Sequence, residues 1–288
     1  MTTMTNSQPV KKVIFDGGAE YRGADLRACR YALGLRLEVV AELLGIRQDK
    51  YLEREQSRVW RSVGLWLVDE LQAMEEFVEG LAAQAISAVV ADDAPDPATS
   101  ETVALEVLAS QEQFTSAFPD ASTLRDGTPY PIDLQYVAIG RAAAELSRRG
   151  YTVEVYRGDR RVDLMVRRLA VGLGTNEAAR LFGSTLNKYV TRESGKSAPP
   201  AGMLAELKAI ESFIAQTAEN LPVEHFDSYD TVPLFDDQAL FRRVFPQART
   251  IRDGWWYPAS VAGVAAIRRA RAIAAAGREV RIISATPA

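Results

Sequence analysis

The sequence has very little of the chemistry on which metal centres and disulfides depend. Its 288 residues include one cysteine, Cys29, and one histidine, His225. A single cysteine excludes an intramolecular disulfide, and the two residues together are too few for a zinc, haem or iron–sulfur site. We therefore expect no metal and no other cofactor. His225 stands in a stretch rich in proline and aspartate, so we expect it in a solvated loop.

Long apolar runs are absent too. No stretch of about 18 apolar residues occurs and residues 1–12 are polar, so we expect no membrane span, no secretory signal and a cytoplasmic location. The chain is 47% apolar and 25% charged, which is typical of a globular protein with a full core. The sequence contains no phosphate-binding loop, no metal-ligand spacing and no evident pair of catalytic carboxylates. An enzyme is therefore the least favoured class.

The chain contains an internal repeat. Residues 111–156 align without a gap with residues 238–283 at an offset of 127, and 17 of the 46 aligned positions are identical. Residues 25–55 align with residues 163–193 at an offset of 138, with 13 of 31 positions identical. The blocks follow in the same order in both halves. Since two copies are too few for a solenoid, we expect a fused pair of domains with approximate two-fold symmetry.

The first repeated block has the pattern of a helix-turn-helix. Apolar residues at helical spacing predict three short helices over residues 24–33, 37–44 and 48–56. Gly34 and Gly45 separate these helices, and glycine suits the tight turn that joins the second helix to the third. The second copy follows the same pattern from Leu164 to Glu193, with Gly183 at its turn.

Each half then continues with a long amphipathic helix, an alanine-rich helix that ends at a glycine, and a short β-branched run that predicts a strand. These segments are residues 63–86, 132–149 and 151–156 in the first half and residues 201–219, 259–276 and 279–283 in the second. Polar or acidic linkers precede the alanine-rich region, at residues 91–100 and 222–237. We expect the two strands to pair with each other and so to join the halves.

The run from Leu26 to Glu55 resembles the repressor-type helix-turn-helix of phage and bacterial regulators. Residues 192–200, together with the Phe-x3-Phe-Pro, Asp-Gly and Tyr-Pro elements of residues 241–262, look like the YdiL-like family, which includes anti-CRISPR-associated repressors. The resemblance implies a small homodimer in which an N-terminal helix-turn-helix reads DNA and the C-terminal half makes the dimer contact. It also implies repression, with RNA binding in some members. The sequence departs from the pattern at Leu37 and Thr175, where glutamine is usual.

These observations predict a mainly α fold of two tandem repeats that form a pseudo-dimer. Each repeat is a repressor-type helix-turn-helix bundle followed by a helix–strand subdomain that resembles a dimerisation unit. The expected segments are a flexible arm at residues 1–20, helix-turn-helix domains at residues 21–88 and 158–221, and linkers with dimerisation-like subdomains at residues 89–157 and 222–288.

Positive charge is concentrated on the two motifs. Residues 22–61 hold nine Lys and Arg against six Asp and Glu, and residues 157–196 hold nine against four, so the rest of the chain carries −4 − 3 − 5 = −12. A recognition helix places its N-terminal part and exposed face in the major groove of DNA. The residues we expect to contact DNA are Arg47, Gln48, Asp49, Lys50, Arg54, Arg58, Thr185, Leu186, Asn187, Lys188, Arg192 and Lys196.

Other charged or aromatic positions are expected to serve the fold or the solvent. Each recognition helix has a tyrosine at its inward position and an acid that can bond back to an arginine of the first helix of its motif. Cys29 aligns with Arg167, so we expect a partly exposed position there. The arginines at 148–149 and 268–271 are expected to lie on solvated helix faces. The tyrosine, the acid and the arginine are Tyr51, Glu55 and Arg30 in the first motif, and Tyr189, Glu193 and Arg168 in the second.

The two reading surfaces differ at three of their five aligned outward positions. We therefore expect a monomer that binds an imperfect inverted repeat in double-stranded DNA, with half-site centres about 10–11 base pairs apart or a multiple of that. Two alternatives stay open. The motifs can bind a structured RNA, because Lys and Arg serve both backbones. The net charge of −4, with Asp49 and Glu53 in the first copy, also permits an antitoxin-like protein-interaction module without nucleic acid.

Overall fold

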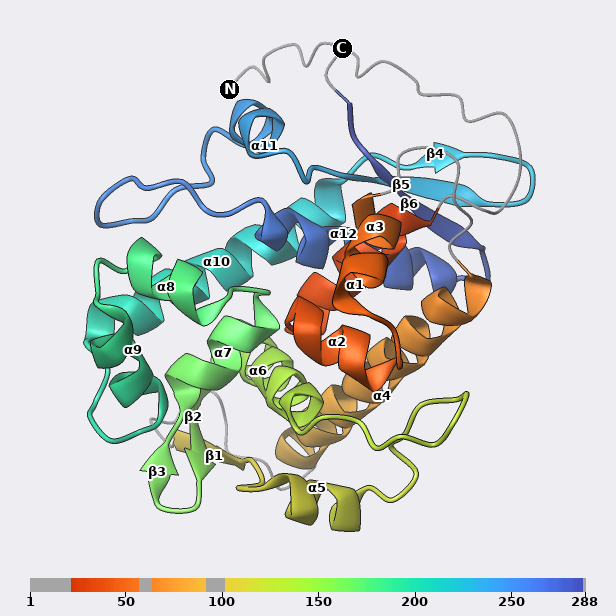
Figure 1. Ribbon diagram of the computed structural model, residues 1–288. Helices are drawn as coiled ribbons and strands as arrows, with labels where there is room; N and C mark the ends of the chain where they lie inside the picture. Colours follow the sequence, from red (N-terminus) through yellow and green to blue (C-terminus); the bar gives the residue numbers. More distant parts are fainter. Residues whose placement is uncertain (1–21, 57–63, 92–101, 287–288) are drawn as a thin grey trace.

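The computed structural model describes residues 22–56, 64–91 and 102–286 (Figure 1). The arm predicted at residues 1–20, most of the linker predicted at 91–100, and Arg58 lie outside these ranges. The described chain is mainly helical. In those three ranges no helix has both the length and the apolar run that crossing a bilayer requires.

The first half of the chain, up to residue 157, begins with the three short helices that the sequence predicts, and α4 extends four residues beyond its predicted end. Its elements are α1 (Gly23–Ala32), α2 (Leu37–Leu43), α3 (Gln48–Gln56), α4 (Leu65–Val90), β1 (Thr102–Glu106), α5 (Gln111–Ala117), α6 (Asp133–Arg148) and β2 (Thr152–Arg157).

The second half presents the same kinds of helices in the same order, with two additional two-residue strands, β3 and β4. Its elements are β3 (Arg160–Arg161), α7 (Asp163–Ala170), α8 (Thr175–Leu181), α9 (Leu186–Glu193), α10 (Ala201–Asn220), β4 (Glu224–His225), β5 (Asp230–Leu234), α11 (Gln238–Val244), α12 (Ser260–Ala274) and β6 (Val280–Ser284).

The strand pairing differs from the prediction. β2 does not pair with β6 but runs parallel to β1, with Val103 opposite Val153, and β6 runs parallel to β5, with Val232 opposite Ile282. β3 and β4 add an antiparallel edge to β2 and β5 respectively, so each sheet in the described chain has three strands. The stretch at residues 222–237 is therefore not a plain linker, because it supplies two of these strands.

The two halves exchange helices. α6 of the first half packs along α7 of the second, and α12 of the second half packs along α1 of the first (Figure 1). The contacts are close: a Cβ added at Gly34 would lie 3.0 Å from the carbonyl oxygen of Leu169, and one at Gly172 would lie 2.8 Å from that of Tyr31. Each helix-turn-helix thus rests on an alanine-rich helix from the opposite half.

The repeated Phe-x3-Phe-Pro block packs on the long helix of its own half. Phe77 of α4 meets three rings with centroid distances of 6.0, 5.7 and 5.7 Å, and Phe213 of α10 meets three rings at 6.1, 5.7 and 5.6 Å, all in edge-on geometry. Edge-on aromatic pairs contribute roughly 0.5–1.5 kcal/mol beyond area burial. The partner rings are Phe114, Phe118, Tyr130, Phe241, Phe245 and Tyr257.

The position shared by Cys29 and Arg167 is buried in both halves, so the expectation of partial exposure is wrong. Burial of Arg167 is possible because its Nη1 lies 2.7 and 2.9 Å from the two carboxylate oxygens of Glu211. Its Nη2 donates to Ser147 Oγ at 2.9 Å. A buried charge is accommodated only when it is paired in this way.

Candidate nucleic-acid interface

The turns of the two helix-turn-helix motifs have the same backbone geometry. Gly45 has φ 62° and Gly183 has φ 60°, a conformation that favours glycine because it has no Cβ. The amide that follows each glycine donates to the carbonyl oxygen of a buried alanine, Ala41 or Ala179, at 2.8 Å. These turns join α2 to α3 and α8 to α9, as the sequence predicts.

An arginine–glutamate pair joins the first and third helices of each motif. Arg30 donates to both carboxylate oxygens of Glu55 at 2.6 and 2.9 Å, and Arg168 Nε donates to Glu193 at 2.5 Å. Both acids are buried, so these are the structural pairs that the sequence predicts. Removing one partner of such a pair costs roughly 3–5 kcal/mol because it leaves a buried charge uncompensated.

Tyr51 and Tyr189 are both 0% exposed, which confirms their assignment to the core. The tyrosine and the buried glutamate four residues later fix which face of α3 and of α9 points inward. The opposite face is left to solvent, as α3 and α9 follow the same alternation of buried and exposed positions. Because this rotation is fixed by buried groups, the outward residues are held in place rather than free to turn.

Most of the residues predicted to contact DNA lie on these outward faces. Arg54 and Arg192 differ from the rest, since both are only half-exposed. Nη1 of Arg192 lies 3.4 Å from Ser184 Oγ and 3.9 Å from Met203 Sδ, so this guanidinium leans against α10. Arg58 lies outside the described residues. The exposed members of the set are Arg47, Gln48, Asp49, Lys50, Thr185, Leu186, Asn187, Lys188 and Lys196.

The two outward faces differ in how their positive charges are used. In the first motif Arg47 lies 2.8 Å from Asp49, and Lys50 lies 2.8 Å from Glu53. In the second motif asparagine and threonine replace these two acids, and within the described ranges Lys188 makes no ion pair. The face of α9 is therefore cationic, whereas that of α3 is close to neutral.

The structure adds a loop in each half that the sequence indicated only as part of the repeat. The guanidinium of Arg125 lies 3.2 Å from a Cβ built on Gly45, and that of Arg252 lies 3.0 Å from one built on Gly183. Both loops therefore lie against the turn of the neighbouring motif. The tip of each loop exposes an apolar side chain: Leu124 is 67% exposed and Ile251 is 70% exposed. The two arginines begin aligned Arg-Asp-Gly triplets at residues 125–127 and 252–254, and this repeat was the signal that could have identified them.

A buried glutamate holds each of these loops against the long helix. Glu70 of α4 accepts hydrogen bonds from the backbone amides of Leu124 and Arg125 at 2.9 and 2.8 Å. Glu206 of α10 accepts the equivalent pair from residues 251 and 252 at 2.9 and 2.8 Å. Charge-assisted bonds to two adjacent amides give the loop a fixed position beside the motif.

Comparison of the chain with family models and with curated proteins found no match. The candidate interface therefore depends on the geometry alone. Among the described residues, no three His, Cys, Asp or Glu side chains come together in a way that could hold a metal ion. His225 is exposed, but it lies in the short strand β4 rather than in a loop, with Nδ1 2.9 Å from Asp230 Oδ1.

Proposed function

We propose that the chain is a sequence-specific DNA-binding repressor of the cytoplasm, built from two tandem helix-turn-helix repeats that act as a pseudo-dimer. The observation that carries the proposal is the equivalent construction of the two outward faces. In each motif a buried tyrosine and a buried arginine–glutamate pair fix the rotation of the third helix, and its polar residues face solvent. Such a preset polar face suits entry into a major groove.

The exchange of helices between the halves supports the pseudo-dimer. α1 packs on α12 and α7 packs on α6, so the two motifs are fixed relative to each other through the core. A conventional regulator obtains this geometry from two copies of one chain, and here one chain supplies both. The proposed target is accordingly an inverted repeat bound by one molecule.

The difference in charge between α3 and α9 supports an imperfect repeat. Cations that are free to approach phosphates provide most of the salt-sensitive affinity for DNA. Lys188 is available for this purpose, whereas Lys50 is engaged with Glu53. We therefore assign the dominant electrostatic contact to the second motif and a more sequence-dependent, weaker contact to the first.

Selection of bound sequences from a random duplex library tests the proposal, followed by stoichiometry and a salt titration on the enriched duplex. We expect an asymmetric inverted repeat bound by one chain. Lys188→Ala should weaken binding and lower the salt slope by about 0.9. The matched variant Lys208→Ala, on the exposed face of α10, should leave both unchanged.

Failure to enrich any duplex would refute the proposal. Enrichment of a structured RNA from a parallel RNA library would instead identify an RNA-binding regulator. If neither library is enriched, and the residual binding only declines with salt, the protein-interaction module becomes the remaining class.

A further inference from the structure

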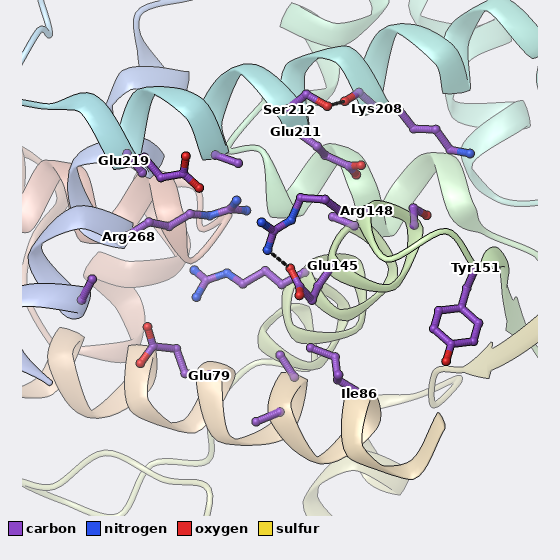
Figure 2. Close-up of a pocket in the computed structure, with 18 of the residues that line it drawn as sticks. Glu79, Ile86, Glu145, Arg148, Tyr151, Lys208, Glu211, Ser212, Glu219 and Arg268 are labelled. Carbon is purple, nitrogen blue, oxygen red and sulfur yellow. Dashed lines mark hydrogen bonds and ion pairs between the residues drawn. The ribbon is translucent and has the colours of Figure 1, made fainter. Parts of the chain in front are cut away.

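A cavity lies between the long helices and the alanine-rich helices of the two halves. It has a volume of about 710 Å³ and is lined by residues of α4, α6, α10 and α12 (Figure 2). This volume falls in the range of about 300–1,000 Å³ that is typical of small-molecule sites. Alanines and Ile86 form the apolar part of its wall, and charged side chains enter it from both halves.

Arg268 is the unusual member of this lining. The sequence predicted a solvated position for it, but its side chain enters the cavity from α12 and faces Arg148 of α6 (Figure 2). Across the described ranges it makes no hydrogen bond and no ion pair. Arg268 is partly buried, and a guanidinium that loses part of its water without a carboxylate partner gains no equivalent interaction in return.

Within the described part of the chain, Arg268 lacks a carboxylate partner because the two halves differ in sequence around it. Arg141 aligns with Arg268, and it pairs with Glu75 of its own half at 2.6 Å. The acid that corresponds to Glu75 is Glu211, but Arg167 occupies that acid at 2.7 Å. In the first half the position of Arg167 is Cys29, which does not pair with the acid. The substitution of an arginine at position 167 thus leaves Arg268 without its partner.

The surrounding charges also leave the charge of Arg268 uncompensated. Burial, with Arg141 adding its like charge, lowers the pKa of Arg268 to about 10, which keeps the group charged at neutral pH. Two acids of the lining are already paired: Glu79 pairs with Arg271, and Glu145 pairs with Arg148 at the end of α6 and with Arg149. Glu219 is the lining carboxylate that lies on the same side of the cavity as Arg268 (Figure 2).

We propose that this cavity binds a small organic anion whose phosphate or carboxylate group is held between Arg268 and Arg148. Guanidinium groups present paired donors that match either oxyanion, and the alanine-rich wall suits an apolar body attached to it. The site lies where the two halves meet, away from the outward faces of α3 and α9. It does not depend on the proposed function, because the cavity and its charges exist whether or not the motifs bind DNA.

Calorimetry and thermal unfolding of the full chain at constant ionic strength test the site, with pyrophosphate and citrate as separate probes. We expect saturable binding of at least one probe and a rise in Tm, and the stronger probe identifies the oxyanion class. Arg268→Met should weaken that binding by at least about tenfold. It should also raise the Tm of the protein without anion, because it removes an uncompensated charge. This second readout shows that the variant is folded.

Two further variants separate the site from general electrostatics. Arg243→Ala removes an exposed charge of α11 and should leave the affinity unchanged. Glu219→Gln removes the lining carboxylate that lies on the same side of the cavity as Arg268, and it should tighten anion binding. The inference is overturned if neither probe binds saturably, or if both bind Arg268→Met as tightly as the unmodified chain.

Discussion

Replacing Asp49 with asparagine and Glu53 with threonine tests whether the outward faces of α3 and α9 differ in DNA binding through their acids alone, as the proposed function requires. These are the residues that the second motif has at the same positions. Both acids are on the exposed face of α3, where they pair with Arg47 and Lys50 at 2.8 Å. Exposed pairs of this kind contribute only about 0–1 kcal/mol to stability, so the double variant should fold normally.

The expected magnitude follows from the two cations that the exchange releases. Each cation that newly neutralises a phosphate steepens the dependence of log K on log salt by about 0.9 for duplex DNA. Release of Arg47 and Lys50 should therefore steepen the slope by up to about 1.8, with tighter binding at low salt. The preference for an asymmetric site should also weaken, because the two faces become more alike.

Fluorescence anisotropy with the selected duplex, measured at several salt concentrations, gives the slope directly. A matched control, Glu112→Gln with Asp120→Asn, changes the net charge equally on exposed residues at and just after α5. The double variant should differ from this control. If both change the slope by the same amount, only net charge matters, and our assignment of α3 to the DNA contact would be wrong.

Two other predictions concern the scaffold. Gly140→Ala in α6 should destabilise the protein by roughly 1–3 kcal/mol in urea unfolding, because the added Cβ would lie 2.3 Å from the carbonyl oxygen of Val166 in α7. The control Gly80→Ala, with open space around its Cβ, should stabilise by about 0.5–1 kcal/mol, and equal effects would refute the close packing. The hydrogen bond from Arg278, with a further one from His225, lowers the pKa of Asp230 to about 2. Asp230 therefore stabilises the fold above its unfolded pKa of about 3.9, and this stabilisation is lost as the pH falls to 2. Asp230→Asn should be less stable than the unmodified chain at pH 5 and should approach it at pH 2, and a constant difference would contradict the assignment.

The sequence was sufficient for the helices of each motif and for their internal contacts, but it did not predict α5 and α11. Helical spacing with glycine at each turn located α2 and α3 within one residue, and the alignment of Arg30 with Arg168 and of Glu55 with Glu193 correctly indicated the structural pairs. These are local features, since the pairing residues lie 25 positions apart within one small bundle. Such contacts fix the rotation of a short helix, so the residues on its outward face could be predicted as well.

The sequence pattern did not predict which strands pair. A β-branched run identifies a strand but not its neighbour, and the alternation of Val103 and Leu105 in β1 is too short to predict a strand. β5 contains Asp230 and Pro233, which are typical of a linker. The chain forms it nevertheless, because residues 230–234 run parallel to β6, which follows α12. Tertiary context overrode local preference here.

In the proposed pseudo-dimer, the presence of both motifs in one chain would allow the faces of α3 and α9 to diverge. In a homodimer every substitution appears twice, so an acid opposite Lys50 would weaken both contacts with DNA at once. In one chain the second contact is intramolecular, and its effective concentration depends on the core that joins the motifs rather than on the strength of either contact. The packing of α1 on α12 and of α7 on α6 provides that joining. Under the proposed function, one motif could then lose electrostatic affinity, or a position such as Arg167 could take a new partner, while the other motif keeps its contact with DNA.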